Sequence, residues 1–267
     1  MLIIKRYLSF LLGIITFVFW ETFFFFSPKI TDKLLLHRII LGWFLLYIAI
    51  LVLSLWYLEK NKLQDIRQKI AYFILPVVLV LNWVSFLVYL DFGRIFLHLM
   101  ALFLGVAVWL YVESFFLKYY FVRFYKLHSF ENMAEEIIIF TSFLVFVNFF
   151  SFKVYVDWAY YKLFIMVAVI LLLLVFAQFA FNNLLTKKNC LIYLIVIPFL
   201  GLEFLFVSTF LPTNFYSLAM INTLFFYLFM IFARHHLLEK LSDKMARRYL
   251  SLIAILLIFI LIISRWT

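Results

Sequence analysis

Long apolar runs recur along the chain, separated by short polar segments. Each run is close to the roughly 20 apolar residues that a helix needs to cross the hydrocarbon core of a bilayer. Because lipid offers backbone groups no hydrogen-bond partners, such segments are expected to be helical throughout. This length predicts nine spans, at residues 8–26, 39–58, 70–90, 95–117, 137–152, 163–181, 191–210, 215–232 and 249–263. The fifth is among the shortest, so its full crossing is the least certain of the nine. The pattern predicts an all-α, polytopic transmembrane bundle that forms a single domain over residues 1–267.

The basic residues are distributed unevenly between the predicted loops. With the N-terminus in the cytoplasm, 16 of the 23 lysines and arginines fall in cytoplasmic segments and seven fall outside. This bias follows the positive-inside rule, so a cytoplasmic N-terminus is predicted. Lys29, Lys33 and Arg38 oppose the bias. However, leaving the first run outside the membrane would invert every later loop and worsen the distribution.

The composition supports a membrane location and excludes several other classes of protein. Of the 267 residues, 69% are hydrophobic and 13% are charged, and the mean hydropathy is +1.15. A soluble fold of this size could not bury so much apolar surface. The net charge of +10 comes from short loops rather than from a basic domain, so no nucleic-acid partner is predicted. Cys190 is the only cysteine, which excludes an internal disulfide.

A few polar residues interrupt the predicted spans at similar depths. Counting from the span ends at 1.5 Å per residue places Glu21, Asn82, Asn148, Glu203 and Asn222 in one layer near the membrane midplane. Ionisable groups at such a depth are often functional. Carboxyl groups among amides could bind a cation, relay a proton or hold a polar headgroup. The alternative is structural, because asparagines also join transmembrane helices by hydrogen bonds worth about 0.6–2 kcal/mol.

Charged residues near the span ends form a second set of candidates. Asp91, Arg94 and His98 share one helical face at the predicted outer surface. There Asp91 could cap the next helix, with Arg94 as its partner, or act with His98 as an acid–base pair. Glu113 precedes Lys118 by a little over one turn near the inner surface. That spacing favours an ion pair, or a side chain that extends to the interface, over catalysis.

Residues 233–248 carry apolar residues at helical spacing opposite charged ones. This pattern predicts either an amphipathic helix that anionic lipid attracts to the cytoplasmic face, or helix ends that extend into water. His235, His236 and Glu239 lie in the same segment, but such a set is more typical of solvated polar residues than of a metal site. The zinc-protease motif, the phosphate-binding glycine loop and the nucleophile elbow are all absent from the sequence. No metal and no cofactor are therefore predicted.

Several short motifs in the last two thirds of the chain occur in a recognisable order. They are Ile74-Leu75-Pro76, Glu113-Ser114, the run from Glu203 through Phe210 to Pro212, Arg248-Tyr249-Leu250 and Ser264-Arg265-Trp266. In these motifs residues 70–267 resemble a family of polytopic membrane proteins from candidate-phyla (Patescibacteria-like) bacteria, a domain of unknown function. The resemblance implies a location in the bacterial inner (plasma) membrane and singles out Glu113 and Glu203 as matching acidic positions. Ser114 departs from the asparagine that the family carries, so a shared role for that dipeptide is in doubt.

The sequence leaves three functions open. The first is a small carrier, channel or lipid-binding bundle whose polar site includes Glu203 and Glu21. The second is a structural or assembly subunit that docks a membrane protein partner. The third is an enzyme acting on a lipid-linked substrate through Asp91 and His98. The bilayer itself, with anionic lipid at the cytoplasmic face, is the one partner expected in all three.

Overall fold

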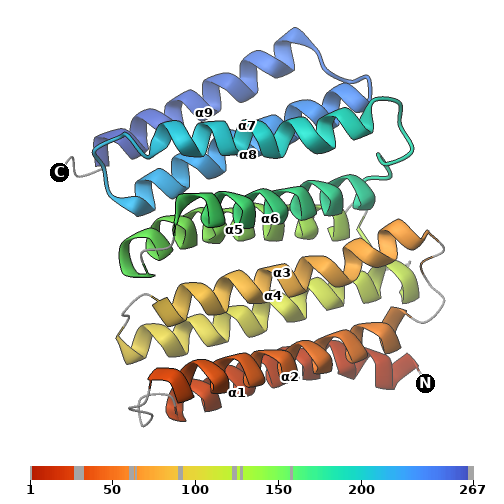
Figure 1. Cartoon of the computed structure of the whole chain (residues 1–267). Helices are drawn as coiled ribbons and strands as arrows, with labels where there is room; N and C mark the ends of the chain where they lie inside the picture. The colour runs from red at the N-terminus through yellow and green to blue at the C-terminus, as the bar shows by residue number, and fades with distance from the viewer. Residues whose placement is uncertain are drawn as a thin grey trace. The chain divides into compact units, whose positions relative to one another are not determined.

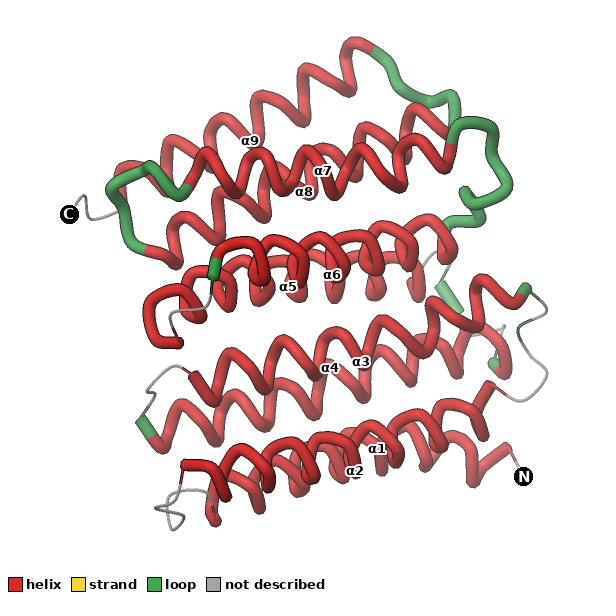
Figure 2. Tube along the Cα trace, in the orientation of Figure 1, coloured by secondary structure: helices red, strands yellow, loops and turns green. Residues whose placement is uncertain are grey.

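The computed structural model describes residues 2–26, 33–59, 63, 65–89, 93–121, 125–126, 129–156 and 159–263. These residues fold into nine α-helices and one π-helical turn, η3 (Phe152–Val156), which continues the fifth helix (Figure 1). The helices are α1 (Leu2–Phe26), α2 (Lys33–Glu59), α3 (Ile66–Tyr89), α4 (Arg94–Tyr120), α5 (Ser129–Ser151), α6 (Tyr160–Phe181), α7 (Cys190–Ser208), α8 (Phe215–Leu237) and α9 (Asp243–Ile263). Figure 2 shows the described connections, such as the loop from α6 to α7, in green. The all-α prediction is confirmed.

Eight of the helices, α1 to α8, are long and apolar enough to cross a membrane. The described part of the chain is therefore that of a multi-pass membrane protein. The ninth predicted span lies in α9, which begins six residues earlier, at Asp243, and carries Lys244, Arg247 and Arg248 in its first turns. Within the described residues α9 does not reach the apolarity of the other eight. The cytoplasmic N-terminus stays a prediction.

The fifth helix is longer than the apolar run predicted. Its candidate span, Ser129–Val154, has 26 residues, enough for a full crossing. The run at 137–152 looked short because Glu131, Glu135 and Glu136 precede it. The helix continues through these carboxylates, and two of them form ion pairs with other helices.

Contacts divide the chain into two compact units. The first comprises Met1–Val80 and Asp91–Ala134, and the second comprises Leu81–Leu90 and Glu135–Thr267. The divisions fall inside α3 and α5, so each of these helices contributes to both units. The units are described separately below, and the single transmembrane domain stays a prediction.

In the first unit, α1 and α4 pack antiparallel with their backbones in close contact. A Cβ atom added to Gly13 would lie 2.9 Å from the carbonyl oxygen of Gly105 and 2.7 Å from the Cβ atom of Trp109. A Cβ atom on Gly105 would lie 2.8 Å from the carbonyl oxygen of Gly13. Small residues allow such close approach, which strengthens van der Waals contact between helices in lipid. A hydrogen bond of 2.8 Å between the Thr16 and Tyr47 hydroxyls joins α1 to α2.

In the second unit, consecutive helices are neighbours. α6 packs on α7, α7 on α8, and α8 on α9. Gly201 of α7 lies against Leu171 of α6 and Phe226 of α8. The rings of Phe204 and Phe225 approach to 3.8 Å between centroids, so aromatic contacts also hold α7 to α8.

We expect Gly13→Ala to destabilise the protein by roughly 1–3 kcal/mol, because the new methyl group would overlap Trp109 and the backbone of α4. Unfolding in mixed detergent micelles, followed by circular dichroism, measures the change. Gly42→Ala is the matched control, since nothing lies within 4 Å of a Cβ atom there. The control should be neutral or slightly stabilising. Equal effects at the two positions would contradict the close packing of α1 and α4.

Candidate functional site

The asparagines of the predicted midplane layer are used in hydrogen bonds between helices. The Asn148 Nδ2 atom of α5 donates to the Asn82 carbonyl oxygen of α3 at 2.8 Å, and the Asn82 Oδ1 atom lies 3.4 Å away. The Asn222 Nδ2 atom of α8 donates to the Ser208 hydroxyl of α7 at 2.8 Å. All four residues are buried. These contacts fit the structural alternative for the asparagines, in which they join neighbouring helices.

The two acidic residues predicted for the layer have different surroundings. Glu21 of α1 lies 2.6 Å from the Nδ1 atom of His98 on α4, with side chains 23% and 50% exposed respectively. Glu203 of α7 is exposed. Among the described residues, nothing forms a hydrogen bond or an ion pair with it. Glu21 belongs to the first unit, and Glu203 belongs to the second unit with the three asparagines. Within the second unit, the described side chain of Glu203 forms no hydrogen bond with any of these asparagines.

The secondary candidates are also rearranged. His98, predicted on one helical face with Asp91 and Arg94, forms a hydrogen bond with Glu21. Asp91 and the side chain of Arg94 lie outside the described residues. Glu113 accepts a hydrogen bond from the Ser9 hydroxyl on α1, whereas Lys118 pairs with Glu131. The Ser9–Glu113, Gly13–Gly105 and Glu21–His98 contacts follow one another along the packed faces of α1 and α4.

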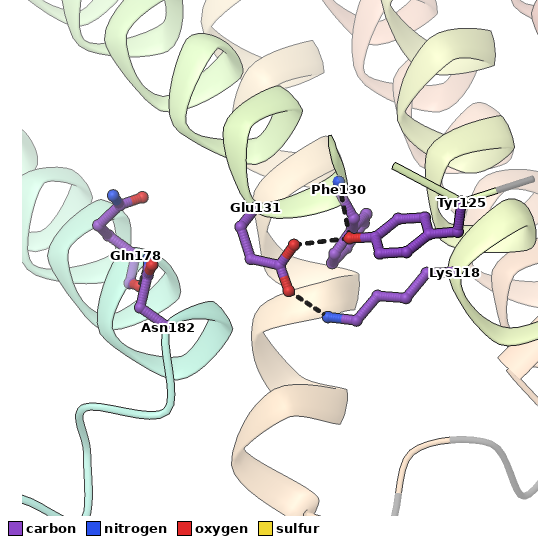
Figure 3. A network of polar contacts seen from close by, with 6 residues as sticks. All are labelled: Lys118, Tyr125, Phe130, Glu131, Gln178 and Asn182. Atoms are coloured by element: carbon purple, nitrogen blue, oxygen red, sulfur yellow. Dashed lines mark hydrogen bonds and ion pairs between the residues drawn. The ribbon is translucent and has the colours of Figure 1, made fainter. Parts of the chain in front are cut away.

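Sequence reasoning missed a charged network around the connection from α4 to α5 (Figure 3). The Lys118 Nζ atom lies 2.5 Å from one carboxylate oxygen of Glu131, and the Tyr125 hydroxyl donates to the other at 2.7 Å. The Phe130 backbone N–H in turn donates to the Tyr125 hydroxyl at 3.1 Å. Burial, followed by the hydrogen bond to Glu131, raises the pKa of Tyr125 to about 12. In the other unit, the Asn182 side chain of Figure 3 caps its own helix by donating to the Gln178 carbonyl oxygen at 2.8 Å.

A hollow between α7 and α8 combines apolar walls with a polar mouth. Its volume is about 190 Å³, and it is lined by Tyr193, Val196, Ile197, Leu200, Phe229, Phe232, Ala233, His236 and Leu241. The Tyr193 hydroxyl and the His236 Nδ1 atom are 3.0 Å apart. Every other lining side chain is apolar. We call this hollow the α7–α8 pocket.

Several lysines lie close in sequence to residues that line the α7–α8 pocket. Lys187 and Lys188 occupy the turns just before α7, within six residues of Tyr193, and both are exposed. Lys240 adjoins Leu241, and Lys244 lies in the first turn of α9. Arg234 is already engaged in an ion pair of 2.6 Å with Glu135. Exposed basic residues near an apolar pocket are typical of sites that bind anionic amphiphiles.

A second hollow, of about 180 Å³, lies over the glycines where α1 and α4 meet. It is lined by Phe10, Gly13, Ile14, Phe17, Leu102, Gly105, Val106 and Trp109, and the indole N–H of Trp109 is the one polar side-chain group among them. Neither this hollow nor the α7–α8 pocket contains a residue of the predicted midplane layer. Within the described residues, no group of three or more His, Cys, Asp or Glu side chains could hold a metal ion.

Comparisons of the chain with protein-family models, with curated proteins and with solved structures find no match. The fold and the site geometry therefore carry the functional argument alone. The family resemblance noted in the sequence stays a prediction.

Replacing Asn148 with Leu should destabilise the protein by roughly 0.6–2 kcal/mol, because the hydrogen bond to the Asn82 carbonyl is lost. Ser85→Ala on α3 serves as the control. Its hydroxyl bonds only to the Leu81 carbonyl of its own helix, so the change should stay within about 0.5 kcal/mol. Both are measured by reversible unfolding in detergent. A neutral Asn148→Leu variant would argue against a structural role for the pair.

Tyr125 gives a pH prediction. Its pKa is about 12 in the folded protein and near 10 when unfolded, so folding favours the neutral phenol. This stabilisation is complete below pH 10 and is lost as the pH rises through about 12. Between these values, the unfolding temperature of the wild type should fall more than that of Tyr125→Phe. Tyr161→Phe, at an exposed tyrosine of α6, should follow the wild type. Parallel curves for wild type and Tyr125→Phe would refute the raised pKa of Tyr125.

Proposed function

We propose that this integral membrane protein is a lipid-binding helix bundle, and that the α7–α8 pocket holds an anionic phospholipid at the cytoplasmic face of a bacterial inner membrane. The observation that carries the proposal is the pocket itself, with apolar walls and the Tyr193–His236 pair at its mouth. Binding sites for amphiphiles need both an apolar region for the chain and a few placed polar groups for the head.

The two ends of such a lipid match different parts of the pocket. Val196, Ile197, Leu200, Phe229 and Phe232 offer apolar walls to an acyl chain. At the mouth, the neutral Tyr193–His236 pair uses one of its two protons in its own hydrogen bond and can donate the other to a phosphate oxygen. The nearby exposed lysines attract a negative headgroup, and each contributes about 1 kcal/mol near a membrane surface.

The other two functions have less support from the geometry. A carrier or channel needs polar groups that face a common path, but the asparagines of the predicted layer are engaged with neighbouring helices. An outer-surface enzyme would use His98 with Asp91, but His98 pairs with Glu21. The positive-inside bias and the family resemblance support the inner membrane as the proposed location.

Native mass spectrometry of the protein in detergent micelles tests the proposal. Wild-type protein should retain phosphatidylglycerol over phosphatidylcholine with the same chains. Tyr193→Phe and His236→Gln should each weaken this retention about two- to tenfold, which is the effect of one lost hydrogen bond. Ala233→Phe, which fills the pocket, should abolish it. Tyr161→Phe, outside the pocket, should bind as the wild type does.

Two results would overturn the proposal. The first is equal retention of the two lipids by the wild type. The second is full retention by Ala233→Phe together with loss in a Lys240→Gln, Lys244→Gln double variant. That second pattern would mean that anionic lipid adheres to the basic surface and does not enter the pocket.

A further inference from the structure

One face of α7 is exposed along the helix at regular spacing. Ile192, Val196, Phe199, Glu203 and Phe206 follow one another at intervals of four, three, four and three residues, and all are exposed. We call this set the docking stripe. The spacing is that of the a and d positions through which two helices pack in a left-handed pair. An apolar side chain loses nothing by facing lipid, so the spacing alone does not indicate a partner.

The carboxyl group of Glu203, which lies in the docking stripe, does indicate a partner helix. Glu203 is the fourteenth residue of α7, about 20 Å along the helix from its start at Cys190. It lies about 7.5 Å before the far end of the helix at Ser208, so it is still within the apolar span, where ionisable side chains pair with one another or face a cavity. Glu203 is exposed on an apolar face, and no described residue bonds to it.

The other carboxyl groups in or beside the spans show how this chain treats such residues. Glu21, Glu59, Glu113, Glu131 and Glu135 each have a partner on a different helix. Four of these partners are basic: His98, Lys69, Lys118 and Arg234. Glu136 and Glu203 differ from these five: Glu136 is exposed near the start of α5, whereas Glu203 is exposed far along α7 and faces the position that a further helix would occupy.

Charge complementarity identifies the chemistry of that helix. We infer that the docking stripe binds a transmembrane helix of another protein, which carries a lysine or arginine at the depth of Glu203. A second copy of this chain does not supply one, because the lysines and arginines of its described spans lie near the span ends. This inference does not rest on the proposal that the α7–α8 pocket binds a lipid.

Association with synthetic transmembrane peptides tests the inference. The labelled full-length protein is placed in phosphatidylcholine vesicles with polyleucine peptides that carry Lys, Leu or Glu at the centre, and energy transfer reports binding. The lysine peptide should bind about tenfold more tightly than the leucine peptide. Glu203→Gln should remove this preference. Glu203→Lys should reverse the charge preference, so that the glutamate peptide binds best.

Glu136→Gln is the matched control, because Glu136 is exposed in α5 but lies outside the stripe. It should keep the wild-type preference for lysine. Glu203→Gln should also keep the wild-type unfolding temperature, since it removes no bond within the described chain. Equal binding of the lysine and leucine peptides by the wild type would overturn the inference. So would self-association of the protein that depends on Glu203, because the occupant would then be a second copy.

Discussion

The structure depends on one constraint, which is that hydrocarbon offers no hydrogen bonds to a polar group. The backbone satisfies it locally, since every span is a helix that pairs its own N–H and C=O groups. Serine and threonine hydroxyls often bond to a carbonyl of their own helix, as Ser85 does to Leu81, whereas several amide and carboxyl side chains reach another helix. Asn148 bonds to α3, Asn222 to α7, and Glu113 to α1. These bonds and the contact of Gly13 with Gly105 make particular helices neighbours, because apolar side chains alone do not distinguish a helix from lipid.

The backbone part of this constraint is why the fold was predictable. Bilayer thickness sets the length of a span, so counting apolar residues locates helices without knowledge of their packing. The predicted run at 163–181 lies within α6 (Tyr160–Phe181) and differs by only three residues at its start. Counting apolar residues misplaces the end of a helix where charged residues belong to that helix. Glu131 and Glu135 belong to α5 because Lys118 and Arg234 compensate them, and neither basic residue is near them in sequence.

The side-chain part explains why the site was not predictable to the same degree. Counting gave the depth of each polar residue, but pairing also requires the direction in which it points and the identity of the neighbouring helix. Glu21 and His98 were assigned to different sets of candidates, although they are bonded partners. Glu203, predicted in the midplane layer, is exposed. Apart from Tyr193, Glu203 and Ser208, α7 is apolar on all sides, so its sequence does not distinguish a buried face from an exposed one.

The two proposals meet on α7. Its first half lines the α7–α8 pocket, and Glu203 lies farther along on the outward face. Val196 belongs to both the pocket and the docking stripe. A helix on the stripe and a lipid in the pocket would therefore touch the same side chain. Any effect of the lipid on the affinity of the helix must equal the effect of the helix on the affinity of the lipid, because binding free energies around a closed cycle sum to zero. Because Val196 belongs to both sets, it is a residue at which lipid composition could affect assembly.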